Sequence, residues 1–129
     1  MTLLMFDVDG FRHINAQFGH LSGDYVLRTI GTKLTRRIRK EEVFARYGGD
    51  EFIVVLPETE VDDALKFAEI IRHTVEVMDF EFDGWKIPVT VSIGVGRYQP
   101  SITTPDELIA SADAALYRAK DHGRNQVSD

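Results

Sequence analysis

Residues 46–56 read RYGGDEFIVVL, and this stretch predicts a β-hairpin. The apolar run 52–56 is typical of a buried strand, and the residues before the glycines, EVFARY (42–47), also favour a strand. Gly48-Gly49 between the two runs is a hairpin turn signal, because tight hairpin turns need positive φ angles. Asp50 and Glu51 therefore stand side by side at the start of the second strand. Such a pair is either a solvated turn or part of a metal site.

The segments before the hairpin predict one strand and two helices. TLLMF (2–6) shows no polar alternation, which is typical of a central strand covered on both faces. A short helix is expected at 11–18, and apolar residues at helical spacing predict a longer one at about 23–39. That longer helix ends in a group of cations, which the helix dipole favours at its C-terminal end. These cations are Lys33, Arg36, Arg37, Arg39 and Lys40.

The segments after the hairpin predict two more helices and two more strands. Helical spacing predicts a helix at 61–77, and the two strands are expected around the turn Asp83-Gly84. Thr104, Pro105 and Glu107 form a capping box with proline at the first helical position. The last helix is expected to end near His122, with a short strand near 125–127 after it.

The order of these elements predicts one α+β domain over residues 1–129. The order β-α-α-β-β-α-β-β-α is typical of a ferredoxin-like palm. We expect a mixed or antiparallel central sheet with flanking helices, packed mainly on one face.

Composition excludes several classes of function. The chain has 129 residues, no cysteine and a formal net charge of −6. These values exclude disulfides and thiolate metal sites, and they argue against binding to nucleic acid or anionic membranes. No apolar run is long enough to span a bilayer and no signal peptide is visible, so we expect a cytoplasmic domain without membrane contact.

Three carboxylates are expected to meet at one edge of the sheet. Asp7 ends the first strand, and Asp50 and Glu51 begin the strand after the hairpin. If these strands are antiparallel neighbours, the three groups converge, and their repulsion calls for a hard divalent cation, Mg²⁺ first. Mg²⁺ on one or two carboxylates is typical of phosphoryl and nucleotidyl transfer. Gly48 and Gly49, without Cβ atoms, would let a nucleotide approach the backbone.

Two further groups of residues are candidates for nucleotide binding. Lys120 and Arg124 share a helical face with Asp113 and suit terminal phosphates, although helix-dipole complementation explains them equally well. The Asn15 amide can read the O6 and N7 edge of guanine, and the Asp24 carboxylate can accept from its N1–H and N2–H₂ groups. Alternatively, Asn15 is a turn residue and Asp24 is an acid in the first turn of a helix.

Five separated motifs together resemble the GGDEF family of diguanylate cyclases. The signature GGDEF stands unbroken at 48–52, and the resemblance covers essentially the whole chain. The other motifs are DVDGFRHIN (7–15), FGHLSGD (18–24), SIGV (92–95) and ADAALYRAKDHGRN (112–125).

The resemblance implies roles for individual residues. Asp7 and Asp50 would ligate Mg²⁺, or Mn²⁺ as the alternative ion, together with the backbone carbonyl of Val8. Glu51 would bind metal or take the proton of the ribose 3′-OH. Guanine would be recognised by Asn15 and Asp24, and phosphates would be held by Lys120, Arg124 and Arg12, where Arg12 replaces the family's usual lysine.

The resemblance also implies a reaction. Two GTP molecules would condense into cyclic di-GMP with release of two pyrophosphates, and two copies of the domain would face each other as a homodimer. The main alternative is a non-catalytic module that senses GTP or cyclic di-GMP. A third hypothesis is an adenylate- or guanylate-cyclase-like enzyme on the same palm.

The sequence departs from the family pattern in two informative places. The inhibitory product site is usually Arg-x-x-Asp, and the matching positions here are Arg39 and Glu42, so we expect weak product inhibition. The family's N-terminal helix and its Asp-x-Leu-Thr-x-Leu-x-Asn-Arg segment do not precede the first strand. We therefore expect a fragment that lacks its upstream sensory domain, is a poor cyclase alone and self-associates non-productively.

Overall fold

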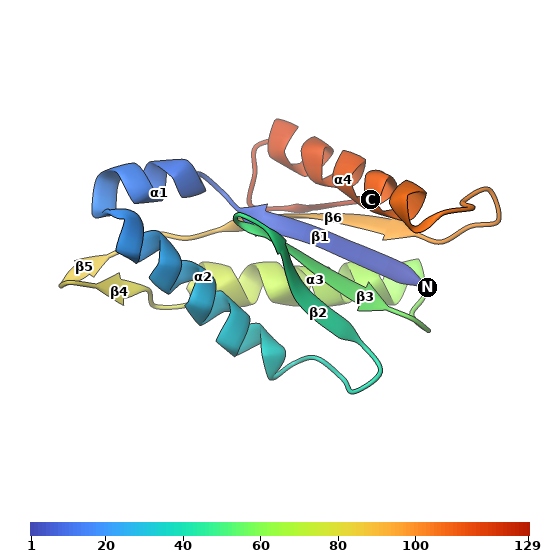
Figure 1. The fold of residues 1–129 in the computed structure, drawn as a ribbon, viewed down its shortest axis with the longest axis horizontal. Coiled ribbons are helices and arrows are strands. Elements are labelled where there is room, and N and C mark those ends of the chain that lie inside the picture. Colours follow the sequence, from blue (N-terminus) through green and yellow to red (C-terminus); the bar gives the residue numbers. More distant parts are fainter.

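A five-stranded mixed sheet forms the centre of the computed structural model, which describes all residues 1–129 (Figure 1). The strand order is β2-β3-β1-β6-β7, and only the β6–β7 pair is parallel. The strands are β1 (Thr2–Val8), β2 (Val43–Gly48), β3 (Glu51–Leu56), β6 (Val91–Arg97) and β7 (Val127–Ser128). This arrangement confirms the predicted α+β palm with a mixed sheet.

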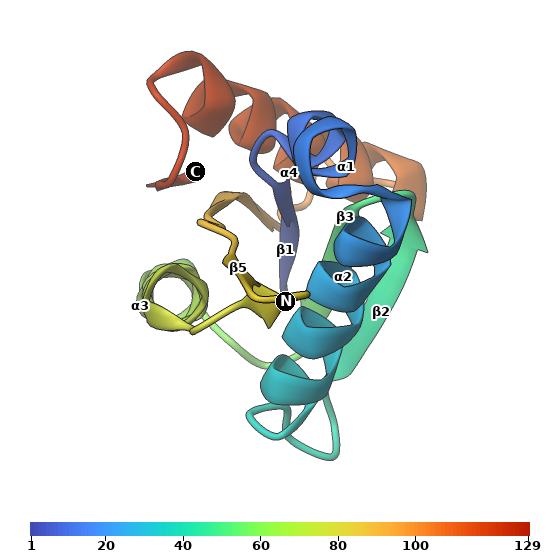
Figure 2. The same ribbon diagram turned by 90° about the vertical axis from the view of Figure 1, so that its left-hand side faces the viewer.

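The structure has four helices, three of which cover the two faces of this sheet. They are α1 (Phe11–Phe18), α2 (His20–Thr35), α3 (Val61–Val77) and α4 (Pro105–Asp121). Figure 2 shows α4 on one side of the sheet and α2 and α3 on the other. None of the four combines the length and the apolar composition that crossing a lipid bilayer requires.

The apolar pattern of β1 explains why both faces are covered. Leu4, Phe6 and Val8 join the large core formed with α2 and α3. Leu3 and Met5 point the other way and pack with Leu108, Ala112 and Leu116 of α4. The expectation that helices pack mainly on one face is therefore wrong for α4, because a strand that is apolar on both sides needs cover on both sides.

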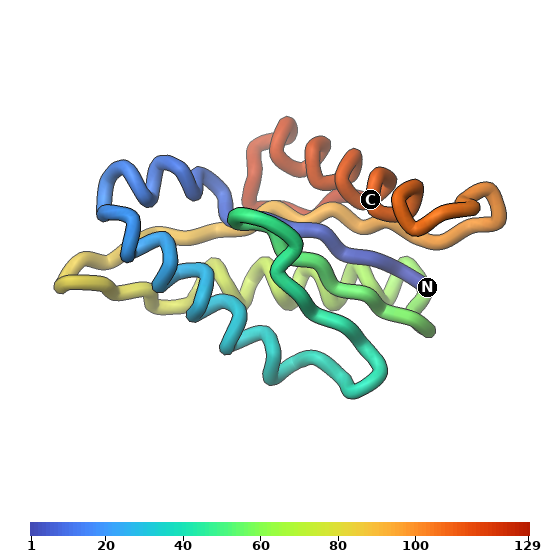
Figure 3. Tube along the Cα trace, viewed as in Figure 1, coloured from blue at the N-terminus to red at the C-terminus, as the bar shows by residue number.

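Two predicted boundaries also differ from the structure. The long helix begins at His20 and ends at Thr35, rather than spanning 23–39, because Gly19 (φ 96°) turns the chain directly from α1 into α2 (Figure 3). The strands around Asp83-Gly84 are only β4 (Glu81–Phe82) and β5 (Trp85–Lys86), which form a separate two-stranded sheet. Pro88 follows β5 and has no N–H to donate, so the long strand of the main sheet begins only at Val91.

The start of α4 follows its predicted signal with one difference. Thr104 is the N-cap, and its hydroxyl accepts a hydrogen bond from the Glu107 amide at 3.3 Å. The Glu107 carboxylate does not return to Thr104; it accepts from the backbone amide (3.2 Å) and hydroxyl (2.9 Å) of Thr103. These contacts hold the pKa of Glu107 below its usual value.

Two glycines of β6 allow α4 to lie directly on the sheet. A Cβ added at Gly94 would lie 2.2 Å from both the Ala112 carbonyl oxygen and the Leu116 amide nitrogen. A Cβ at Gly96 would lie 2.8 Å from the Ala112 amide nitrogen. Since these neighbours are backbone atoms, only glycine fits at this helix–strand distance. The close contact sets the position of α4, and hence of the cation near its end.

Candidate functional site

The hairpin brings the predicted carboxylates to one edge of the sheet. In the antiparallel register of β1 with β3, Asp7 lies opposite Glu51. Asp50 immediately precedes β3, and its charge helps to raise the pKa of both Asp7 and Glu51. Asp7 and Glu51 alternate with the residues that pack against α2 and α3, so they share the face covered by α4.

Asp7 is a buried carboxylate in an unusual electrostatic setting. It is 5% exposed, and burial raises its pKa to about 6 against the opposing effect of Lys120. Lys120 of α4 donates a hydrogen bond to Oδ2, whereas the buried Oδ1 has no partner. An ionised group with an unsatisfied buried oxygen is costly unless a cation or donor approaches it.

Glu51 and its surroundings complete the acidic edge. Burial, Asp113 of α4 and Asp50 raise the pKa of Glu51, and Lys120 lowers it. No three His, Cys, Asp or Glu side chains are already gathered closely enough to form a metal cluster. Even so, the raised pKa values and the free Oδ1 of Asp7 fit a divalent cation that adds oxygen ligands from its own water or substrate.

The hairpin turn leaves open space at its two glycines. Gly49 has φ 32°, and its carbonyl accepts a hydrogen bond from Arg46 Nε at 2.8 Å. Gly48 shows no positive φ, and a Cβ at either position would meet no protein atom within 4 Å. Neither backbone strain nor protein packing therefore requires glycine at position 48.

Asn15 and Asp24 lie at the elbow between α1 and α2. The buried Oδ1 of Asn15 has no hydrogen-bond partner, and a Cβ at Gly23 would come within 1.9 Å of it. Asp24 follows Gly23 in α2 and is 3.8 Å from His20 Nε2. A cavity of about 540 Å³ extends from Asp24 between α2 and the hairpin, reaching Arg46. The importance of Gly23 was missed, because only the α1–α2 packing reveals it.

If Asn15 contributes to nucleotide binding, as the sequence predicts, replacing Gly23 with alanine should weaken that binding without unfolding the domain. Alanine is the better helix former by about 1 kcal/mol, but its methyl group would push the Asn15 amide out of its position. We expect the KM for GTP to rise about tenfold, the equivalent of about 1.4 kcal/mol, with an unchanged or raised Tm. The control is Gly31→Ala in the same helix, where a Cβ meets nothing within 4 Å. Equal kinetics for both variants would exclude the Asn15 position from substrate binding.

The predicted cations do not share one helical face. Lys120 lies in the last turn of α4 and reaches Asp7, but α4 ends at Asp121. Arg124 lies beyond the helix in the left-handed region (φ 64°), and its side chain is exposed. The helical-spacing argument was therefore wrong for Arg124, because Gly123 (φ 117°) ends the helix before it. Arg12 is exposed in the first turn of α1, and Val8 ends β1 beside Val91.

Asp9 holds together the backbone around this edge, a role that sequence reasoning did not assign. Its carboxylate accepts hydrogen bonds from the hydroxyls of Thr90 (2.8 Å) and Ser92 (2.6 Å) and from the backbone N–H of Asn125 (3.0 Å). Asn125 also has positive φ. Its side-chain Oδ1 accepts a hydrogen bond from Arg72 of α3 (2.9 Å), and its Nδ2 donates one to Glu76 of the same helix (2.5 Å). This network fixes the loop that carries Arg124. The sequence signal that could have revealed this role is the Asp-x-Asp spacing of Asp7 and Asp9 at the end of β1.

The comparisons with known proteins point to one family. Residues 1–126 match the family model described as diguanylate cyclase, GGDEF domain. Diguanylate cyclase A of Treponema denticola is 41% identical over 99% of this chain and 34% of its own length. Diguanylate cyclase DgcM of Escherichia coli is 44% identical over 98% of this chain and 30% of its own length. The chain thus spans about a third of the length of these relatives.

Solved structures show the same architecture. The GGDEF domain of DgcB from Caulobacter crescentus, crystallised in complex with c-di-GMP, has a TM-score of 0.93 and 31% identity, covering 98% of this chain and 75% of that one. Diguanylate cyclase SiaD from Pseudomonas aeruginosa, in complex with its activator SiaC, has a TM-score of 0.92 and 35% identity. The match covers 98% of this chain and 48% of that one.

Proposed function

Because the chain belongs to the GGDEF domain family, we propose that it is the catalytic domain of a diguanylate cyclase that joins two GTP molecules into cyclic di-GMP and releases two pyrophosphates. The observation that carries this proposal is the buried Asp7 carboxylate with its unpartnered Oδ1, directly opposite Glu51 at the GGDEF hairpin. A solvated turn would not need a buried charge of this kind.

The acidic edge is the proposed metal site. Asp7, Asp50 and Glu51, with the backbone carbonyl of Val8, would hold Mg²⁺, or Mn²⁺ in its place. A bound divalent ion would polarise the α-phosphate and lower the pKa of the ribose 3′-OH. Lys120 supports this assignment, because its ammonium already places a positive charge on Asp7. Lys120 would then turn from Asp7 to the phosphates of the nucleotide.

Guanine and phosphate recognition are proposed for the residues around this edge. The unpartnered Oδ1 of Asn15 needs a donor, and guanine supplies N1–H and N2–H₂. Asp24 would accept from the same edge of the base. Lys120, Arg124 and Arg12 would hold phosphates, and the open space at Gly48 and Gly49 leaves room for the nucleotide beside the backbone.

The proposed chemistry uses Glu51 and a second copy of the domain. Each 3′-OH would attack the α-phosphate of the other nucleotide, with pyrophosphate as the leaving group. The raised pKa of Glu51 makes its carboxylate a better proton acceptor than an ordinary glutamate. One domain has one such edge, so a homodimer with the two edges facing each other would supply both nucleotides.

The direct test is incubation of the chain with GTP and Mg²⁺, followed by chromatography for cyclic di-GMP. We expect product that depends on protein concentration with a reaction order above one, because two domains must meet. Asp50→Asn should remove the product. GTP binding without any cyclic di-GMP, even at high protein concentration, would contradict the proposal and favour a sensing module.

Base selectivity gives a prediction for Asp24. Asp24→Ala should weaken GTP binding by about tenfold or more, or about 1.4 kcal/mol or more, and leave ATP binding nearly unchanged. The reason is that guanine, unlike adenine, has the N1–H and N2–H₂ groups from which the Asp24 carboxylate would accept hydrogen bonds. Competition titrations with the two nucleotides measure this. Equal losses of affinity for GTP and ATP would mean that Asp24 only supports the structure of the α1–α2 elbow and does not recognise the base.

Product inhibition should be weak. The Glu42 carboxylate turns back to accept a hydrogen bond from the backbone amide of Arg39 at 2.8 Å. It is therefore occupied locally instead of orienting the Arg39 guanidinium toward a ligand. We expect cyclic di-GMP to inhibit turnover only at concentrations well above those of a tight site, and Arg39→Ala to change the inhibition constant less than twofold. Tight inhibition that Arg39→Ala abolishes would contradict this expectation.

A further inference from the structure

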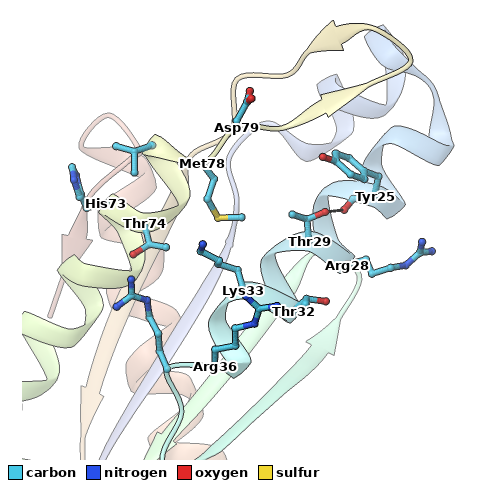
Figure 4. Close-up of a pocket in the computed structure, with 12 residues that line it drawn as sticks. Tyr25, Arg28, Thr29, Thr32, Lys33, Arg36, His73, Thr74, Met78 and Asp79 are labelled. Carbon is cyan, nitrogen blue, oxygen red and sulfur yellow. Dashed lines mark hydrogen bonds between the residues drawn. The ribbon is translucent and has the colours of Figure 1, made fainter.

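A second large cavity lies away from the acidic edge, between α2 and α3. Its volume is about 830 Å³, and Met78 and Asp79 lie at one end of it, where the chain leaves α3 (Figure 4). It contains none of the residues proposed above for metal, guanine or phosphate. Because α2 and α3 cover the sheet face opposite to α4, the cavity is also on the other side of the sheet from Asp7 and Glu51.

The lining of this cavity is strongly positive in a chain of net charge −6. Four of its residues are Arg28, Lys33, Arg36 and Arg37, and none of them lies within ion-pair distance of an acid. The only acid in the lining is Asp79, which lies 4.0 Å from Lys86. Cations left without partners on a protein rich in acids attract an anion from outside.

The side chains converge from two helices. Figure 4 shows Lys33 extending from α2 toward the space that Thr74 and Met78 face from α3, while Arg28 points away from it. Arg36 lines the same cavity from the end of α2. Thr32 and Thr74 also line the cavity, and their hydroxyls make no hydrogen bond within the protein. Helix-dipole complementation explains cations at the end of α2 but not their convergence with groups of α3.

The cavity has a second, less polar end. Tyr25 and Met78 line it near the two-stranded sheet, and the Tyr25 hydroxyl is already held by the Glu81 amide at 3.3 Å. The ring of Tyr25 is therefore a fixed surface. The volume falls within the usual range of about 300–1,000 Å³ for small-molecule pockets.

We propose that this cavity binds a small phosphate-bearing ligand, at a site separate from the acidic edge. The phosphate would lie against Lys33, Arg36 and Arg37 and accept hydrogen bonds from Thr32 and Thr74. A flat apolar group of the same ligand would lie toward Tyr25 and Met78. The cleft at Arg39 and Glu42 is a different site, since the two linings share only Arg37.

The test uses AMP as the probe, with the whole chain kept metal-free by EDTA. In ¹⁵N–¹H NMR titrations we expect saturable shifts confined to amides 29–37 and 73–79. The double variant Lys33→Glu/Arg36→Glu should weaken AMP binding at least tenfold. Lys33→Gln/Arg36→Gln, which removes the charges without reversing them, should do the same if the first pair disturbs folding. The matched control is Lys66→Glu, an exposed cation of α3 outside the cavity.

Several results would overturn the proposal. Shifts centred on Asn15 and Asp24 would place AMP at the proposed guanine site instead. Equal weakening by Lys66→Glu would mean general charge attraction, and no saturable shift would mean no site. Inorganic phosphate at the same ionic strength should bind several-fold more weakly than AMP; equal binding would overturn the role assigned to Tyr25 and Met78. None of these outcomes depends on cyclase activity, so the proposed catalytic function is tested separately.

Discussion

Asp7→Asn is expected to abolish cyclic di-GMP formation while the domain keeps its fold. The variant keeps the shape of the side chain and removes the charge on which the proposed metal site depends. Turnover should fall by about a thousandfold or more, equivalent to about 4 kcal/mol of transition-state stabilisation. Chromatography of the reaction with GTP and Mg²⁺ measures this, and circular dichroism checks the fold. The control is Asp83→Asn, an exposed turn residue whose positive φ asparagine tolerates.

The pH dependence of stability offers a second readout for Asp7. Its pKa is raised from 3.8 to about 6 in the folded protein, so the folded state binds this proton more tightly than the unfolded state does. The contribution of Asp7 to the free energy of unfolding is therefore complete at low pH, where the group is protonated. It is lost as pH rises from 3.8 to about 6. Without metal, Asp7→Asn should be as stable as the wild type near pH 4 and more stable, by about 1 kcal/mol, at pH 7.

The same raised pKa sets an expectation for activity. Below about pH 6 a proton competes with the cation for Asp7, so the metal concentration needed for half-maximal turnover should rise as pH falls. Unchanged turnover in Asp7→Asn, with wild-type dependence on metal, would remove Asp7 from the metal site. A stability difference that does not grow between pH 4 and pH 7 would mean that its burial carries little electrostatic cost.

Gly94→Ala is expected to damage stability and activity together. The new methyl group would lie 2.2 Å from two backbone atoms of α4, and neither can move without shifting the helix. Overpacking of this kind costs about 1–3 kcal/mol or more, so Tm should fall by several degrees. Because Lys120 reaches Asp7 from the same helix, turnover measured well below Tm should also fall.

A matched glycine separates this effect from a general response to alanine. Gly31→Ala adds the same methyl group where no atom lies within 4 Å, and in a helix it should be neutral or stabilising by up to about 1 kcal/mol. Calorimetry on the two variants gives the comparison directly. If Gly94→Ala keeps the wild-type Tm and turnover, α4 tolerates displacement and its close contact with β6 does not position the site.

The sequence predicted the features that depend on neighbours within a few residues. The glycine turn and the apolar run after it indicated the β2–β3 hairpin, and the helix-start signal at Thr104 correctly placed the beginning of α4. The two-sided apolar pattern of β1 indicated a central strand, and β1 does pair with both β3 and β6. These features are local because φ preferences, capping and side-chain alternation act within one turn or one strand.

The tertiary structure alone decided the features that join distant parts of the chain. Lys120 meets Asp7 across 113 positions of sequence, and Asn125 meets Asp9 across 116. The cover of α4 on the second face, the place of Arg124 beyond the helix and the cavity between α2 and α3 likewise followed from packing. Such contacts depend on how closely helices and strands approach one another, as at Gly94, and no local pattern of residues encodes that distance.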